Sequence, residues 1–142
     1  MKVWSAHFAK LGAPLPELLS LSGVEARIIL ALRHAIICQK LQRNPMAGLE
    51  ERLGIRLAVT RFLIVLESVG NAWPDNFHLG RNCCRHTTAD EITLLQMIRC
   101  CALGDRPAYD QLLCEMMDED ARNRVFIDIS NFVSAYQRPT PG

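Results

Sequence analysis

The chain of 142 residues carries a formal net charge of +1, with 49% hydrophobic and 22% charged residues. This length suits one domain with a sizeable core, and this composition is too apolar for a disordered protein. The balanced charge provides no long-range attraction, which makes nucleic-acid and anionic-membrane binding less expected without excluding either. We therefore expect a single globular domain over residues 1–142.

Residues 1–20 are predicted to form an irregular N-terminal arm. Met1–Lys10 lacks the continuous apolar stretch of a signal peptide, and Gly12, Pro14 and Pro16 interrupt regular structure. Elsewhere, charged residues break each apolar run before it reaches the roughly 18 residues of a membrane span. The sequence therefore predicts a cytoplasmic protein with no membrane segment.

The first predicted helix runs from Ser22 to about Leu41. Ser22 and Glu25 have the spacing of a capping box, in which each side chain bonds the backbone amide of the other residue. The apolar residues that follow cover more than one stripe. This helix should therefore be largely buried, with Arg27 and Arg33 on its solvent side.

Two further helices are predicted on either side of Gly54. Asn44 and Pro45 open the first of them, which covers about residues 46–53. The second, over about residues 56–69, is apolar nearly all round, which is typical of a helix at the centre of a bundle.

The clearest helix start in the chain lies in its second half. Thr88 and Glu91 form another capping box, and Gly104 is a natural end for the helix that they begin. Asp105 then caps a short helix, and the short connection predicts that the two helices form an antiparallel hairpin.

A last helix is predicted over about residues 119–136, and residues 138–142 should form a flexible tail. Together these elements predict an all-α fold. We expect a single-domain bundle of five or six helices around the buried central helix at about residues 56–69.

Four of the six cysteines form two pairs, Cys83–Cys84 and Cys100–Cys101. A helix of about four turns should hold the pairs apart, so one ion is not expected to bind both. Cys83 and Cys84 precede a helix start among basic residues, a setting that favours thiol reactivity. With His86 they supply the donors of a zinc site, to which His78 adds a fourth. The competing and favoured interpretation is that the cysteines are reduced and simply packed.

His34 and Cys38 are four residues apart and therefore share one face of the first helix. Two such side chains are half of a metal site, and the sequence offers no evident partner pair. Packing at the edge of the core is the favoured interpretation.

Residues 49–63 resemble a helix-turn-helix, with Gly54 in the turn. A recognition helix needs a polar face for phosphates and bases, and here Arg56, Thr60 and Arg61 would provide it. The helix is otherwise apolar, so a core helix is the favoured interpretation. DNA binding through these three residues is the alternative.

Cys84–Glu91, followed by Leu94-Leu95 and Gly104-Asp105, resembles a group of short alphaproteobacterial helical proteins without an established activity. In that group a cysteine precedes a helix that begins with threonine and glutamate, and a Leu-Leu pair and a Gly-Asp turn follow. The resemblance covers about residues 54–135. It implies an all-helical fold and a bacterial cytosolic setting, and it assigns no site residue.

We expect a small cytosolic regulatory or adaptor protein that works by protein–protein interaction and without catalysis. Its partner would be another protein or a second copy of itself. Its contact surface should be an apolar face of the helix at 22–41 or the Met116–Met117 region. The alternative is a thiol- or metal-responsive sensor centred on Cys83 and Cys84, coupled to helix-turn-helix-like DNA binding.

Overall fold

The computed structural model describes residues 16–81 and 84–137. Within these residues the fold consists of six α-helices and one short 3-10 helix, without a β-strand. The elements are η1 (Leu18–Ser20), α2 (Gly23–Lys40), α3 (Met46–Leu53), α4 (Arg56–Ala72), α5 (Ala89–Leu103), α6 (Arg106–Leu113) and α7 (Glu119–Tyr136). The prediction of an all-α bundle of five or six helices is confirmed. The predictions for residues 1–15, for Cys83 and for the tail at 138–142 lie outside the described residues.

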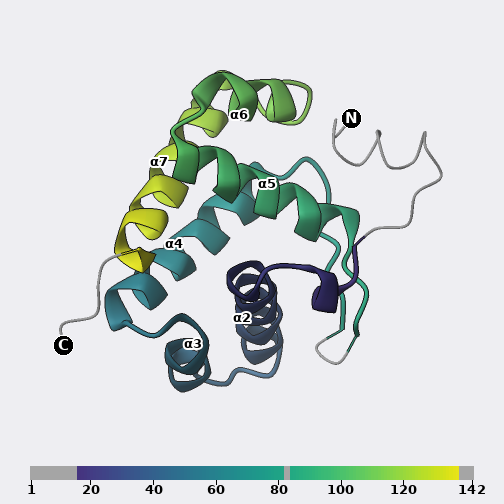
Figure 1. Ribbon diagram of the computed structural model, residues 1–142, viewed down its shortest axis with the longest axis vertical. Helices are drawn as coiled ribbons and strands as arrows, with labels where there is room; N and C mark the ends of the chain where they lie inside the picture. The colour runs from purple at the N-terminus through teal and green to yellow at the C-terminus, as the bar shows by residue number, and fades with distance from the viewer. Residues whose placement is uncertain (1–15, 82–83, 138–142) are drawn as a thin grey trace.

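The helices are arranged around the pair formed by α4 and α7. Figure 1 shows α5 and α6 at one end of the molecule, α2 and α3 at the other end, and α4 and α7 between them. Phe62 of α4 packs against Phe132 of α7, with 5.3 Å between the ring centroids. Both rings are buried in one continuous core to which all six α-helices contribute.

The helix boundaries follow from local capping chemistry. Both predicted capping boxes form, at Ser22 with Glu25 and at Thr88 with Glu91. Gly104 ends α5 in the left-handed conformation at φ 65°, which glycine adopts without steric cost. These ends were predictable because a cap depends only on residues close together in the chain.

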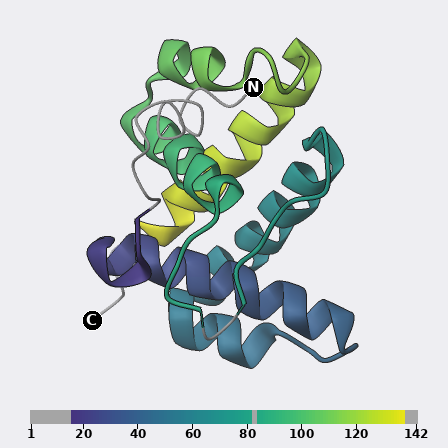
Figure 2. The ribbon, with the colours of Figure 1, turned by 90° about the vertical axis from the view of Figure 1, so that its right-hand side faces the viewer.

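The connection between α4 and α5 crosses the molecule. Figure 2 shows it leaving the end of α4, running to α2 and returning to the start of α5. Trp73 packs against Phe77 with 4.8 Å between ring centroids, and Phe77 and Leu79 lie against the core. The connection is therefore part of the packed structure although it contains no helix.

Three expectations about burial are wrong. Arg33, placed on the solvent side of its helix, is only 2% exposed, because its charge is fully paired inside the molecule. The Met116–Met117 region, one candidate for the contact surface, cannot serve as one, because both side chains point inward and are buried in the core. Cys114, expected to be packed, is exposed. No described helix is both long and apolar enough to cross a membrane.

Candidate functional site

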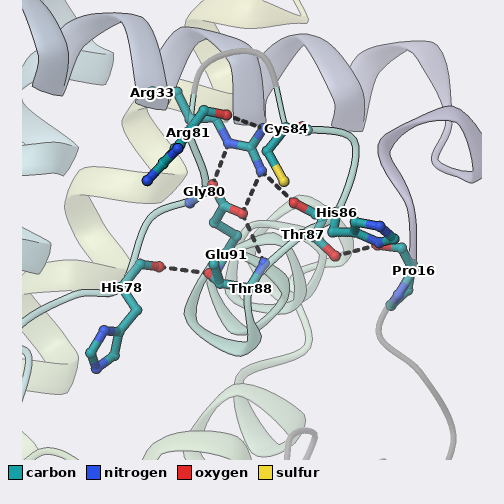
Figure 3. A network of polar contacts seen from close by, with 10 residues as sticks. All are labelled: Pro16, Arg33, His78, Gly80, Arg81, Cys84, His86, Thr87, Thr88 and Glu91. Carbon is teal, nitrogen blue, oxygen red and sulfur yellow. Dashed lines mark hydrogen bonds and ion pairs between the residues drawn. The ribbon is translucent and has the colours of Figure 1, made fainter.

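Arg33 of α2 organises the segment in which the sequence placed a metal or redox site. Its guanidinium donates hydrogen bonds to the backbone carbonyls of Arg81, Cys84 and His86, at 3.0, 2.7 and 2.8 Å (Figure 3). These carbonyls come from the connection that leads into α5. A buried arginine from a distant helix therefore shapes this part of the chain.

Glu91 neutralises the buried arginine. Its two carboxylate oxygens accept hydrogen bonds from Nε and Nη2 of Arg33 at 2.7 and 2.9 Å (Figure 3). They also accept from the backbone amides of Thr88 at 2.9 Å and of Gly80 at 3.3 Å. The carboxylate is completely buried, and a buried charge is tolerated when it is paired and hydrogen-bonded in this way.

The same segment is tied down by bonds from its neighbours. Asp90 accepts a hydrogen bond from the backbone amide of His78 at 2.7 Å, and Thr88 donates from its hydroxyl to the His78 carbonyl at 2.6 Å. The Thr87 hydroxyl donates to the Pro16 carbonyl, which joins the segment to the start of the described chain. The network holds the backbone of the connection in place.

Of the four predicted metal ligands, the structure describes Cys84, His86 and His78 and does not bring them together. Figure 3 shows the two imidazole rings on opposite sides of the Arg33–Glu91 pair. Among the described residues, no three side chains of His, Cys, Asp or Glu are grouped as metal ligands would be. A site that depends on Cys83 lies outside the described residues and stays a prediction.

The second cysteine pair is unsuited to thiolate chemistry. Burial raises the pKa of the Cys101 thiol to about 12, and burial also raises the pKa of Cys100. Both thiols are therefore protonated near neutral pH, and the reactive form of a cysteine is the thiolate. All five described cysteines are free thiols.

His34 and Cys38 do meet on α2, with 3.5 Å between Nε2 and Sγ. The pair lies against α3 at a point where the backbone of Gly48 comes very close. A Cβ atom at that position would lie 2.1 Å from Nε2 of His34. The favoured interpretation as packing at the core edge agrees with this close approach.

The predicted DNA-binding residues lie together on the surface of α4. A helix-turn-helix shape is present, because Gly54 turns the chain between α3 and α4 at φ 87°. Arg56 and Thr60 are exposed, Arg61 is half-buried, and Glu50 approaches Arg56 to within 4.0 Å. Exposed apolar side chains share the face with them, so the polar surface that DNA readout needs is small. DNA binding stays a prediction.

An apolar hollow on the described surface lies elsewhere, between α2, α5 and α7. We call it the α2–α5–α7 groove, and its volume is about 620 Å³. Figure 2 shows the C-terminal end of α7 beside the first turns of α2, and residues from both line the groove. Its floor is apolar and buried, and consists of Ile28, Leu95, Ile98, Phe132 and Val133. Apolar clefts of this size commonly hold ligands or side chains of a partner.

The rim of the groove carries one pair of opposite charges. Nη2 of Arg99 donates to Glu25 at 2.6 Å, and the Arg99 side chain is 53% exposed. Val24 is 49% exposed beside it, and Tyr136 closes the far side. The site therefore combines an apolar floor with a charged group that reaches solvent.

Little in the sequence indicated the groove, because its walls come from three separated helices. One signal was available. Val24 follows the capping serine of α2 by two residues, and a large apolar side chain is not needed there for the cap. In the structure Val24 is exposed and lines the groove.

Comparisons with models of known families, with curated proteins and with solved structures find no match for this chain. The resemblance to short alphaproteobacterial helical proteins therefore stays a prediction. Function must be inferred from the geometry of the described residues.

Removing Glu91 should be far more damaging than removing the glutamate at the equivalent position of the other capping box. Glu91→Ala leaves the Arg33 charge buried and unpaired, and should lower the free energy of unfolding by about 3–5 kcal/mol. Glu25→Ala removes a cap and a surface ion pair, for a loss of about 1–2 kcal/mol. Urea denaturation followed by circular dichroism measures both. Equal losses would contradict the central role of the buried pair.

Gly80 should not accept a side chain. A Cβ atom there would lie 2.2 Å from Nη2 of Arg33, whose guanidinium is fixed by five hydrogen bonds. We expect Gly80→Ala to destabilise the protein by about 2–3 kcal/mol. Gly70→Ala is the control, because a Cβ atom in that helix meets nothing within 4 Å and should stabilise by about 0.5–1 kcal/mol. Thermal and urea unfolding show whether each variant is less stable or more stable than the wild type.

Stability should fall in alkaline solution because of buried protonated groups. Burial raises the pKa of Cys101 from 9.0 to about 12 and raises that of Tyr109 above its ordinary 10.0. Above about pH 9 the unfolded chain loses these protons while the native chain keeps them, so stability falls as pH rises. Each group contributes a slope of about 1.4 kcal/mol per pH unit between its two pKa values.

The variant Cys101→Ala isolates one of these groups. Between pH 9 and pH 11 its stability should decline less steeply than that of the wild type, by about 1.4 kcal/mol per unit. Urea unfolding at several pH values measures the slopes. Parallel slopes would show that the Cys101 thiol does not resist ionisation in the native protein.

Proposed function

We propose that this protein is a small helical binding module that holds an amphipathic helix of a partner protein in the α2–α5–α7 groove. The observation that supports the proposal is the apolar floor of the groove next to the exposed pair of Glu25 and Arg99. Helix-in-groove recognition uses an apolar trough for anchoring side chains and charges at its edge for orientation. On this proposal the protein acts by binding and not by catalysis.

The dimensions of the groove favour a helix as its occupant. The α5 wall consists of Leu95, Ile98, Arg99 and Ala102, which span two turns and about 10 Å. A partner helix with apolar side chains at positions i, i+4 and i+7 presents anchors over the same length. Its apolar stripe would cover the floor, while its polar side would face solvent.

The rim suggests the charge of the partner. Arg99 uses Nη2 to bond Glu25, and a guanidinium has five donors in all. An aspartate or glutamate beside the apolar stripe of the partner helix would accept from the exposed donors that point to solvent. We therefore propose an amphipathic partner helix with at least one acidic residue next to its apolar stripe.

The proposal retains the cytoplasmic setting that the sequence predicts. The five described cysteines are free thiols, and a reducing compartment keeps thiols in that form. The proposal is also compatible with self-association of the protein, which would use a surface other than the groove.

A displayed library of random 15-residue peptides tests the groove. We expect selection against the wild-type protein to enrich peptides with apolar residues at i, i+4 and i+7 and an acidic residue beside them. Val24→Glu places a charge at the groove wall and should weaken binding of the enriched peptides at least tenfold. Fluorescence polarisation of labelled peptides gives the dissociation constants.

Leu103→Glu is the matched control, because Leu103 is 75% exposed on α5 and does not line the groove. It introduces the same charge and should leave peptide binding unchanged. Peptides that bind the wild type and Val24→Glu equally well would place the binding site elsewhere. Failure to enrich any helical pattern would refute the proposal.

A further inference from the structure

The outer side of α4 is an exposed helix face with an apolar centre. We call it the α4 outer face. Leu57 and Ile64 are each 40% exposed on it. The exposed residues of this face repeat every three or four positions along the helix, and are Leu57, Thr60, Ile64, Glu67 and Asn71. Helix α4 packs its other side into the core and is thus left uncovered along this one.

Charges are placed symmetrically around the centre of this face. Arg61 lies three residues before Ile64, and Glu67 lies three residues after it. Within residues 16–81 and 84–137 neither of the two forms an ion pair. Along the helix axis the face therefore carries a positive charge at Arg61, an apolar side chain at Ile64 and a negative charge at Glu67.

Such a face is complementary to itself when two copies meet in opposite directions. A two-fold axis at Ile64 would set Arg61 opposite the partner's Glu67, and Glu67 opposite the partner's Arg61. A parallel arrangement would instead oppose two arginines and two glutamates. Isologous dimers require a surface that is self-complementary in this sense. We propose that the protein forms a homodimer in which the α4 outer faces of two copies pack antiparallel around Ile64.

Helix α7 adds a second exposed apolar side chain, Ile127, near the proposed two-fold axis. Leu57 and Arg61 share a shallow hollow with Asn131, Ser134 and Ala135, so the outer sides of the two helices are continuous.

The direction of α7 places its exposed isoleucine close to the centre. Phe62 packs against Phe132, and Leu57 lines the same hollow as Ser134, as in an antiparallel pair. Ile64 is then level with residues near 130, within about one helical turn of Ile127. Ile127 is 58% exposed. Two exposed isoleucines at the centre, with charges outside them, match the apolar core and polar rim of protein interfaces.

The size of the face predicts a weak dimer. From Leu57 to Asn71 the helix rises about 21 Å, and two neighbouring helices are about 20 Å wide. The footprint is on the order of 400 Å² per copy, about half of what a stable interface buries on each side. The dimer should therefore be reversible, with a dissociation constant of about 10 µM or weaker.

This surface lies on a different side of α7 from the groove. Val133, Tyr136 and Gln137 line the groove, whereas Ile127, Asn131 and Ser134 point outward. The homodimer does not depend on peptide binding, and peptide binding does not depend on the homodimer. Each proposal can fail without the other.

Analytical ultracentrifugation over about 1 µM to 1 mM tests the dimer. The wild type should shift from monomer to dimer over this range. Ile64→Glu buries two like charges at the axis and should remain monomeric, whereas Leu103→Glu, which is away from the face, should dimerise like the wild type. A wild type that is monomeric at 1 mM, or an Ile64→Glu variant that still dimerises, would overturn the proposal.

Charge reversal tests the antiparallel pairing. R61E and E67R should each dimerise about tenfold more weakly, because each creates like-charged pairs on both sides of the axis. The double variant R61E/E67R should recover wild-type association. Most directly, an equimolar mixture of R61E and E67R should form a heterodimer, since every pair across the axis is then of opposite charge. Absence of association in the mixture would refute the antiparallel arrangement.

DNA is the competing occupant of this face, because Arg56, Thr60 and Arg61 belong to the same side of α4. Titration of a 20-base-pair duplex at low and high salt distinguishes the two. Salt-dependent binding that R61E abolishes, with a protein that stays monomeric, would assign the face to DNA and overturn the homodimer. If added duplex produces no binding signal and the protein shows a monomer–dimer transition, the result supports the homodimer.

Discussion

One buried ion pair determines how the two halves of this molecule meet. Arg33 and Glu91 are 58 residues apart in the chain, and their side chains bond each other inside the core. Desolvating two charges is costly, and here the cost is offset because almost every donor and acceptor has a partner. The position of α5, and with it one wall of the groove, depends on this pair. The pair also converts a long connection into a fixed part of the fold.

Local chemistry explains what could be predicted from the sequence. The starts of α2 and α5 and the end of α5 depend on residues within one turn, so Ser22, Thr88 and Gly104 were sufficient signals. Arg33 was misplaced because helical periodicity treats every arginine as a solvent-facing residue. Glu25 and Glu91 occupy the same position in the same capping motif, yet one is at the surface and the other is buried. That difference arises only from tertiary packing, which no local pattern contains.

The candidate sites show the same limit. Cys84 and His86 were singled out for their side chains, but the fold uses their backbone carbonyls to solvate an arginine. The groove was missed because residues such as Ile98 and Val133 have the same apolar character as any core residue, and only the packing of three separated helices brings them to one hollow. The groove and the α4 outer face lie on different sides of α7. The two proposals therefore do not exclude each other, because a partner helix and a second copy would occupy different sides of the molecule.

The three backbone carbonyls that accept hydrogen bonds from Arg33 also restrict the length of the connection before α5. Connections without regular structure usually accept insertions, because their backbone bonds to water. Here the carbonyls of Cys84 and His86 must reach one guanidinium while Thr88 begins α5 a fixed number of residues later. One extra residue between Cys84 and His86 would turn a carbonyl away from the Arg33 guanidinium, which is too deeply buried for solvent to replace the lost bond easily. The segment from Cys84 to Thr88 has no helix, and yet the buried pair restricts its length.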